Sequence, residues 1–152
     1  MEKLKVLLVD DEEEFVKALA DRIQMRDLGA DVALNGEQAL QIVDDEVPDV
    51  MVLDLRMPGI DGMEVLRRVK KAYPKVEVII LTGHGSESDE REARKLGAYD
   101  YLQKPTSIDV LVEKLKEAGS RVNKAMEGTF SAAALAEGGD RGGAEDIIRE
   151  KD

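Results

Sequence analysis

Three short apolar runs rich in β-branched residues stand out along the chain. They are LKVLLVD at 4–10, DVMVLDL at 49–55 and VEVIILT at 76–82. A nearly continuous apolar run of this length is typical of a parallel strand that is covered on both faces. Two fainter segments, DVAL at 31–34 and AYDYL at 98–102, complete a set of five expected strands.

Helical patterns separate these runs, because apolar residues recur three or four positions apart. The positions that mark the first three helices are Phe15, Leu19 and Ile23, then Ala39, Leu40 and Val43, then Val65, Leu66 and Val69. Two more helices are expected at 87–97 and 107–122. Asn35, Asp61 and Ser107 precede three of the helices as N-caps. This alternation of strand and helix predicts a doubly wound α/β fold with a five-stranded parallel sheet.

The expected helix at 87–97 has an unusually sparse apolar face. Only Ala93 and Leu96 are available to face a core, and Gly97 is placed to end the helix. We expect this helix to be the least firmly anchored of the five.

The apolar pattern thins after about residue 122. From Glu127 to the end, seven acidic residues stand against three basic ones, and the segment GGDRGG is typical of a flexible break. We therefore expect one domain over 1–122, followed by an acidic, Gly- and Ala-rich tail over 123–152 that is flexible.

Composition narrows the class of protein. Aromatic residues make up only 3% of the chain, so the core must be aliphatic. The formal net charge of −11 argues against a nucleic-acid-binding surface, which needs basic residues. The absence of cysteine excludes disulfides and thiolate metal sites. No apolar run is long enough to span a membrane, and we expect a cytoplasmic protein that is a monomer or a weak homodimer.

The polar residues whose side chains could bind a ligand or react all fall at one edge of the expected sheet. Asp10 and Asp11 end the first strand, Asp54 ends the third, Thr82 ends the fourth, and Lys104 follows the fifth. Ligands of open parallel sheets bind beyond these carboxyl ends. If the first and third strands are neighbours, the carboxylates converge, and two charges 4 Å apart repel by about 4 kcal/mol at an effective dielectric of 20. Such a cluster needs cations, and Mg²⁺ together with Lys104 fits the ligand set.

Each of these residues also has an ordinary structural explanation when it is taken alone. Asp-Asp before three Glu can be an acidic first helix turn favoured by the helix dipole. Met-Pro-Gly after Asp54 can be a plain turn, and Lys-Pro is a common loop dipeptide. The meeting of five such residues at one edge is what favours a functional site.

The order and approximate spacing of these motifs resemble the response-regulator receiver domain of bacterial two-component signalling. The matching segments are Asp10–Asp11, LDLRMPGIDG around Asp54, ILTGHGS around Thr82, and YDYLQKP with Lys104–Pro105. The resemblance covers roughly 1–122. It implies a flavodoxin-like (βα)5 fold, as in the single-domain chemotaxis regulators, with strand order 2-1-3-4-5.

The resemblance implies a role for each matching residue at the metal and phosphoryl site. Asp54 would be the phosphoryl acceptor. Asp11, Asp54 and the backbone carbonyl of Arg56 would bind Mg²⁺ directly, Mn²⁺ being a possible substitute, while Asp10 would act largely through water. The role of Thr82 and Lys104 would be to bind phosphoryl oxygens, and the Lys104–Pro105 peptide bond would be cis.

The resemblance also implies a conformational switch with protein partners. Thr82 would move toward the phosphoryl group and Tyr101 would turn inward behind it, while Arg56 and His84 would tune access of water. The output face would be formed by 87–97, the fifth strand and the last helix. A histidine kinase or phosphotransfer protein would donate the phosphoryl group, and an unknown output protein would read the switch. The chain would not be an enzyme beyond its own phosphorylation and autodephosphorylation.

Two rival classes stay open at the level of the sequence. A Mg²⁺-dependent aspartyl-phosphate phosphatase usually carries its nucleophile in an Asp-x-Asp motif after the first strand, where this chain has Asp-Asp. A flavodoxin-like binder needs Gly, Ser or Thr in that turn for the flavin phosphate, and the turn here is acidic. The GHGS turn at 83–86 lacks the Lys and the spacing of a nucleotide P-loop.

Overall fold

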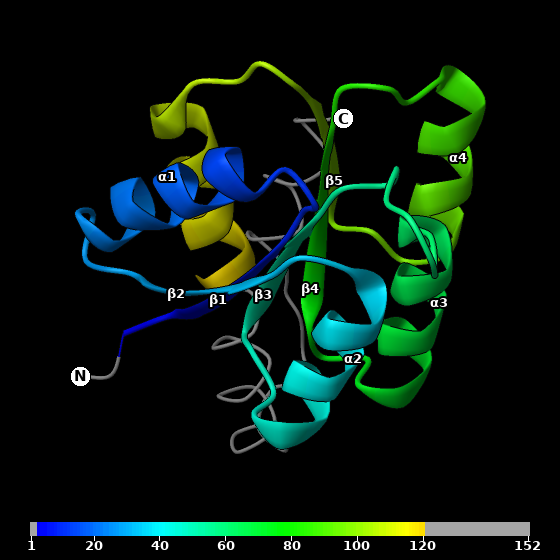
Figure 1. The fold of residues 1–152 in the computed structure, drawn as a ribbon, viewed down its shortest axis with the longest axis horizontal. Helices are drawn as coiled ribbons and strands as arrows, with labels where there is room; N and C mark the ends of the chain where they lie inside the picture. Colours follow the sequence, from blue (N-terminus) through cyan, green and yellow to red (C-terminus); the bar gives the residue numbers. More distant parts are fainter. Residues whose placement is uncertain (1–2, 121–152) are drawn as a thin grey trace, which may run out of the picture. The chain divides into compact units, whose positions relative to one another are not determined.

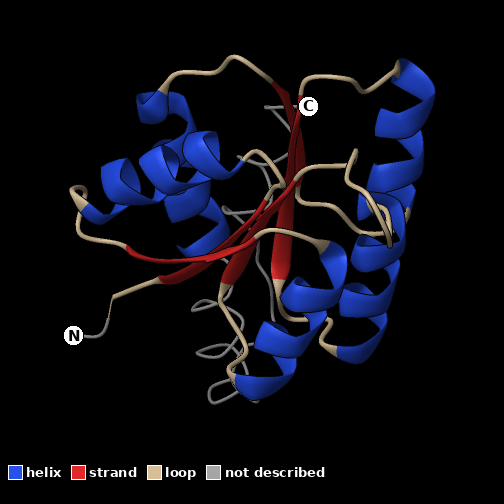
Figure 2. Ribbon diagram, in the orientation of Figure 1, coloured by secondary structure: helices blue, strands red, loops and turns tan. Residues whose placement is uncertain are grey.

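The computed structural model describes residues 3–120, which form a five-stranded parallel sheet with helices on both faces (Figures 1 and 2). The strand order is β2-β1-β3-β4-β5, so the predicted fold class and strand order are confirmed. The strands are β1 (Lys5–Val9), β2 (Gly29–Ala33), β3 (Val50–Leu53), β4 (Glu77–Thr82) and β5 (Asp100–Gln103). The predicted tail at 123–152 and the end of the last predicted helix lie outside the described residues.

Five helices alternate with these strands in the described part of the chain. They are α1 (Glu13–Gln24), α2 (Gly36–Asp45), α3 (Gly62–Ala72), α4 (Glu87–Lys95) and a fifth helix from 108 to the last described residue at 120. The helix α1 and the helix 108–120 cover one face of the sheet, and α2, α3 and α4 cover the other (Figure 1). Within residues 3–120, no helix has the length and apolar character needed to cross a membrane.

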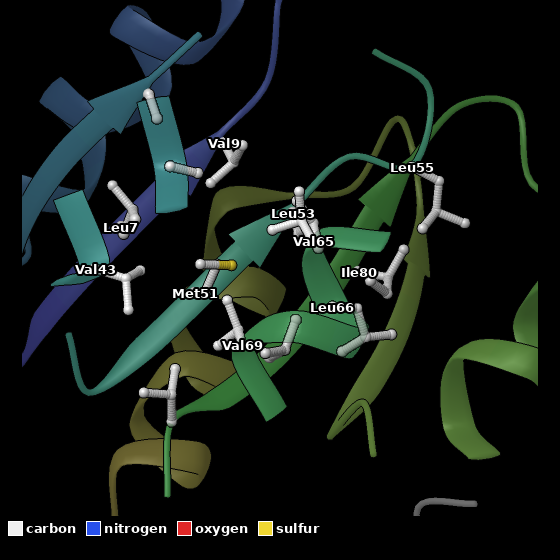
Figure 3. Close-up of a cluster of buried hydrophobic side chains, with 14 of the residues drawn as sticks. Leu7, Val9, Val43, Met51, Leu53, Leu55, Val65, Leu66, Val69 and Ile80 are labelled. Carbon is white, nitrogen blue, oxygen red and sulfur yellow. The ribbon is translucent and has the colours of Figure 1, made fainter. Parts of the chain in front are cut away.

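The core consists of two apolar clusters, one on each face of the sheet. Successive strand residues point to opposite faces, so Leu7 and Met51 belong to the cluster under α2, α3 and α4 (Figure 3). Their neighbours Leu8 and Val52 belong to the cluster under α1 and the helix 108–120. Burial on both faces explains why β1, β3 and β4 are apolar without interruption.

The predicted helix caps are confirmed by hydrogen bonds. The Asn35 side chain accepts from the Gln38 N–H at 2.8 Å, and the Asp61 side chain accepts from the Glu64 N–H at 3.0 Å. Ser107 accepts from the N–H of residue 110 at 3.1 Å. These side chains satisfy donors that the first helical turn leaves without a partner.

Two details of the structure differ from what the apolar pattern suggests. Phe15 fits the apolar spacing of the first helix, but its side chain is 38% exposed, because it lies in the first turn of α1 at the edge of the sheet. The second strand begins at Gly29, earlier than the predicted 31–34, and Gly29 pairs with Lys5. This strand is the edge of the sheet and is only partly buried, which weakens its apolar pattern.

The helix α4 is held to the rest of the domain by few apolar contacts and by a charged network. Ala93 is its only buried residue, which agrees with the sparse face predicted for it. The Asp100 carboxylate on β5 accepts a hydrogen bond from Arg94 of α4 at 3.1 Å and pairs with Lys114 of the helix 108–120 at 2.9 Å. Asp100 therefore connects the three elements of the predicted output face.

We expect Asp100→Asn to lower the free energy of unfolding by about 2 kcal/mol at pH 7, because two cations lose their shared anion. Burial opposes the charge of Asp100, but Lys114, the Tyr101 N–H and Arg94 outweigh burial and lower its pKa below the ordinary 3.8. The stabilisation is therefore complete above the unfolded-state value and is lost as the pH falls through the lower folded-state pKa.

Urea unfolding of both proteins at several pH values measures this effect. The difference between them should shrink as the pH falls below about 4. Asp45→Asn, at an exposed position on α2, is the matched control and should change stability little. A stability difference for Asp100→Asn that is independent of pH would show that the charge is not responsible.

Candidate functional site

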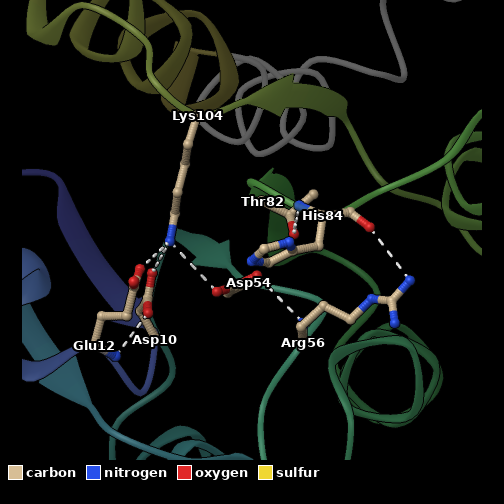
Figure 4. Close-up of polar contacts among 7 residues, drawn as sticks. All are labelled: Asp10, Glu12, Asp54, Arg56, Thr82, His84 and Lys104. Carbon is tan, nitrogen blue, oxygen red and sulfur yellow. Dashed lines mark hydrogen bonds and ion pairs between the residues drawn. The ribbon is translucent and has the colours of Figure 1, made fainter.

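Three buried polar side chains lie together at the carboxyl ends of neighbouring strands. Asp10 follows β1, Asp54 follows β3, and Thr82 ends β4 (Figure 4). Their exposed fractions are 3%, 5% and 0%, and they are the buried polar residues of the described chain. Backbone hydrogen bonds fix the first two, because the Asp10 N–H donates to Ala33 O and the Asp54 N–H donates to Val9 O. The sheet register thus brings both carboxylates to one edge.

The Lys104 ammonium group lies among the carboxylates. Its Nζ is 2.7 Å from Asp10 Oδ2, 2.8 Å from Glu12 Oε1 and 3.4 Å from Asp54 Oδ2 (Figure 4). It also lies 4.5 Å from the centre of the Phe15 ring, within the range of a cation–π interaction. The Lys104–Pro105 peptide bond that precedes the next helix is cis, as the resemblance implies.

Burial and charge act in opposite directions on the titration of these groups. Burial disfavours the Lys104 ammonium, but hydrogen bonds from Lys104 to Asp10 and Glu12 outweigh burial and raise its pKa. For Asp10, burial outweighs the hydrogen bonds with Lys104 and the Glu12 N–H, so its pKa is raised. The exposed Glu12 carboxylate has a lowered pKa because it accepts a hydrogen bond from Lys104. Lys104 is therefore a firmly charged cation at this site.

The carboxylates of Asp10, Glu12 and Asp54 have the chemistry of a site for a hard divalent cation. One oxygen from each lies within 4.8 Å of the others. Oxygen ligands of this kind suit Mg²⁺, which keeps several of its waters. The contact of all three with the Lys104 ammonium shows that this position already stabilises a cation. The donor set therefore fits the predicted metal.

The structure brings Glu12, which the sequence prediction missed, into the cluster, and gives Asp11 an exposed side chain outside it. The Glu12 N–H donates to Asp10 Oδ1 at 2.9 Å, and its carboxylate accepts a hydrogen bond from Lys104 at 2.8 Å. Asp11 as a direct metal ligand stays a prediction. The sequence signal for Glu12 was its place two residues after Asp10, but the acidic run at 10–14 also suits a plain helix start.

Arg56 connects the loop after β3 to the loop after β4. Its backbone N–H donates to Asp54 Oδ1 at 3.2 Å, and its guanidinium donates to the backbone oxygen of His84 at 3.2 Å (Figure 4). The guanidinium also lies 3.6 Å from Asp89 Oδ2, and Asp89 forms a capping box with Ser86 at the start of α4. Arg56 therefore reaches toward α4 and not into the carboxylate cluster.

Thr82 and His84 meet at the end of β4. The His84 N–H donates to Thr82 Oγ1 at 3.3 Å, and the His84 side chain is exposed. Because the Thr82 hydroxyl accepts this bond, its own hydrogen stays available to donate to another acceptor.

Tyr101 points inward behind Thr82 in this structure. Its side chain is 8% exposed, and its hydroxyl is the one buried side-chain polar atom within residues 3–120 without a hydrogen-bond partner. A Cβ atom built on Gly85 would overlap the Tyr101 hydroxyl and lie 2.8 Å from Cζ of the ring. The phenol therefore occupies space that the missing side chain of Gly85 leaves open.

Comparison with known proteins identifies this arrangement. A family model described as the response regulator receiver domain matches residues 6–116. An NtrX-like response regulator of Rickettsia typhi is 40% identical over 120 residues, which cover 78% of this chain and 25% of that relative. The chain thus spans about a quarter of the length of this relative.

Solved structures agree with the family match. The receiver domain of NtrX from Brucella abortus superposes with a TM-score of 0.72 at 29% identity, over 76% of this chain and 98% of that one. A CheY-like receiver domain from Methanospirillum hungatei superposes with a TM-score of 0.79 over 82% of this chain and 99% of that one. Its identity of 23% supports the fold alone. No family of enzymes is indicated, and the phosphatase and flavin-binding alternatives are set aside by the family match. The chain belongs to the response regulator receiver domain family.

Proposed function

We propose that this chain is a phosphorylation-dependent signalling switch in which Asp54 accepts a phosphoryl group from a histidine kinase or a phosphotransfer protein. The observation that carries the proposal is the buried Asp54 carboxylate with the Lys104 ammonium 3.4 Å away, at the edge of the sheet where two further carboxylates gather. A carboxylate can act as a nucleophile and form a covalent acyl phosphate.

The transfer needs no reactant other than Asp54 and the phosphorylated histidine of the donor. An Asp54 oxygen attacks the phosphorus of a phosphohistidine, the P–N bond breaks, and the imidazole of the donor leaves with the electron pair. Positioning and charge neutralisation supply most of the catalysis in such transfers. The protein itself would contribute a fixed carboxylate and the Lys104 cation.

Mg²⁺ would be held directly by Asp11, Asp54 and the backbone carbonyl of Arg56, and by Asp10 largely through water, with Mn²⁺ as a substitute. When bound, it would neutralise the negative charge that gathers between the carboxylates and the phosphoryl oxygens. The contact of Asp10 and Asp54 with the Lys104 ammonium supports this proposal, because it marks a position where a cation is stabilised.

After the transfer, Lys104 and Thr82 would hold the new phosphoryl oxygens. The Lys104 ammonium reaches Asp54 already, and the Thr82 hydroxyl lies at the end of the neighbouring strand β4. Each charge-assisted hydrogen bond stabilises the phosphorylated state by roughly 1.5–3 kcal/mol. The side chains of Arg56 and His84 would flank the site and influence how readily water reaches the acyl phosphate.

The signal would leave through α4, β5 and the helix 108–120, gated by Thr82 and Tyr101. The sparse packing of α4 supports this, because an element with few buried contacts shifts at low cost. An output protein that binds this face better in one state would read the phosphorylation. We propose the cytoplasm as the setting, in line with the acidic and cysteine-free composition of the chain.

Intact-protein mass spectrometry with a small phosphodonor tests the proposal. Incubation with acetyl phosphate and Mg²⁺ should add one phosphoryl group to the wild-type protein, and chelation of the metal should prevent it. Asp54→Asn should show no adduct, because the amide is not a nucleophile of this kind. Asp21→Asn, at an exposed position on α1, is the matched control and should react as the wild type does. An equal adduct on Asp54→Asn would assign the acceptor elsewhere.

A further inference from the structure

Glu12 occupies the N-cap position of α1 but does not cap the helix. Its side chain makes no hydrogen bond to the N–H groups of the first turn. The carboxylate turns instead toward Lys104, 92 residues away in the sequence, and binds its ammonium at 2.8 Å. The Glu12 carboxylate is thus engaged at the edge of the sheet where Asp10 and Asp54 lie, and not at the start of the helix.

Phe15 reaches the same ammonium from the same helical turn. Its ring centre is 4.5 Å from Lys104 Nζ, and its side chain is 38% exposed although it is large and apolar. Together Glu12 and Phe15 form what we call the lysine seat. Neither residue is among the metal ligands that the sequence predicts.

The lysine seat competes with the buried carboxylates for the ammonium. Lys104 Nζ lies 2.7 Å from Asp10 and 2.8 Å from Glu12, and it is farther from Asp54, at 3.4 Å. A divalent cation bound by Asp10 and Asp54 would neutralise their charge, and the Lys104 ammonium would then keep Glu12 and Phe15 as its partners. Without the seat, the ammonium would rest wholly on Asp10 and Asp54, where it would oppose entry of the cation.

We propose that Glu12 is a positioning residue that acts through Lys104, and that it raises the affinity of the site for Mg²⁺ by holding the ammonium away from Asp54. Phe15 assists as the second part of the lysine seat. This inference rests on the proposed function, since it concerns the same metal and phosphoryl site. It adds the N-cap residue and one first-turn residue of α1 to the residues that determine metal affinity.

Calorimetric titration of the full chain with Mg²⁺ tests the role of Glu12. Glu12→Gln should weaken Mg²⁺ binding about fivefold, the lower end of ordinary coupling between two binding events. Glu14→Gln, two residues further along the first turn of α1, removes the same charge and is the matched control. It should change the affinity by less than about twofold, as expected for a screened charge at the surface. Equal effects of the two substitutions would overturn the proposal.

Two further variants separate an action through Lys104 from direct attraction of the metal. Phe15→Leu changes no charge, yet it should weaken Mg²⁺ binding about twofold because the ammonium loses a cation–π contact. In a Lys104→Gln background, Glu12→Gln should have no more effect than Glu14→Gln. If the fivefold loss persists in that background, Glu12 binds or attracts the metal itself and the lysine seat is wrong.

The same titration of Asp54→Asn keeps this proposal separate from the proposed function. If Asp54→Asn weakens Mg²⁺ binding but Glu12→Gln does not, the metal site stands and only the lysine seat is overturned. If Asp54→Asn leaves the Mg²⁺ affinity unchanged, the proposed site itself fails.

Discussion

Gly62→Ala is expected to lower the free energy of unfolding by about 2 kcal/mol or more and to slow phosphorylation of Asp54. A Cβ atom at residue 62 would overlap the backbone oxygen of Asp54 and lie 2.6 Å from Cα of Leu55. These are backbone atoms in a buried turn, so no side-chain rotation can relieve the overlap. Overpacking of this kind costs about 1–3 kcal/mol, and alanine's better helix propensity offsets less than about 1 kcal/mol.

The effect on phosphorylation follows from the same contact. The turn that approaches Gly62 carries Asp54, and the Gly62 N–H donates to Leu55 O at 3.0 Å. Relief of the overlap has to displace this turn or the start of α3, and we expect it to move Asp54, the proposed phosphoryl acceptor, relative to Lys104. Displacements of about 1 Å can reduce rates about a hundredfold, and we expect at least a tenfold slower adduct formation with acetyl phosphate.

Chemical denaturation and the rate of adduct formation measure the two effects of Gly62→Ala. Gly83→Ala is the matched control, because a Cβ atom at Gly83 would meet the Lys104 side chain at an ordinary 3.8 Å. The control should remain within about 0.5 kcal/mol of the wild type. If both variants behave like the wild type, the close approach of the turn to α3 does not hold Asp54 in position.

The main outline of the fold could be predicted because local patterns and long-range packing agree. The runs around Leu8, Val52 and Ile79 are apolar on both faces, and the structure buries them on both faces. The caps at Asn35 and Asp61 depend on neighbours three residues away, so the sequence carries their whole signal. The strand order came from the family resemblance and not from the pattern, because periodicity does not say which strands are neighbours.

The parts of the site that were missed depend on contacts between distant residues. An acidic residue before a helix has the same local pattern whether it caps the helix or turns to a distant cation. Glu12 turns because Asp10 accepts its N–H and Lys104 lies above it. Phe15 fits the period of the buried helix face, but its ring meets the same lysine at the edge of the sheet. The Arg56 guanidinium likewise donates to the backbone oxygen of His84, 28 residues away in the loop after β4.

Gly85→Ala is expected to turn Tyr101 out to solvent while leaving stability within about 1 kcal/mol of the wild type. The atom that a Cβ at residue 85 would overlap is the Tyr101 hydroxyl, at the end of a side chain that can rotate. The backbone of Gly85 does not have the positive φ found at Gly59 and Gly97, so alanine fits it without strain. The Tyr101 hydroxyl also has no hydrogen bond to lose in the inward position. Substitution of glycine by alanine is therefore expected to be tolerated at residue 85, although it should disrupt the turn at Gly62.

The functional consequence of Gly85→Ala should be a loss of transmission without a loss of phosphorylation. If inward Tyr101 belongs to the state that phosphorylation favours, alanine at 85 removes that state whether or not Asp54 is modified. A shift of the two switch states from 1:99 to 99:1 requires about 5.5 kcal/mol. The overlap at residue 85 would remove the contribution that burial of the Tyr101 ring makes to this free energy.

Thr82→Ala should likewise accept the phosphoryl group and transmit poorly, because the Thr82 hydroxyl can no longer contact the phosphoryl oxygens.

Amide NMR of residues 83–112, with and without beryllofluoride as a mimic of the phosphoryl group, measures the transmission. The wild type should show shifts on α4 and β5, whereas Gly85→Ala should show shifts confined to the neighbourhood of Asp54. Gly83→Ala is again the control and should respond as the wild type does, since residue 83 lies in the same loop without meeting Tyr101. If Gly85→Ala responds on α4 and β5 as fully as the wild type, the inward position of Tyr101 plays no part in the signal.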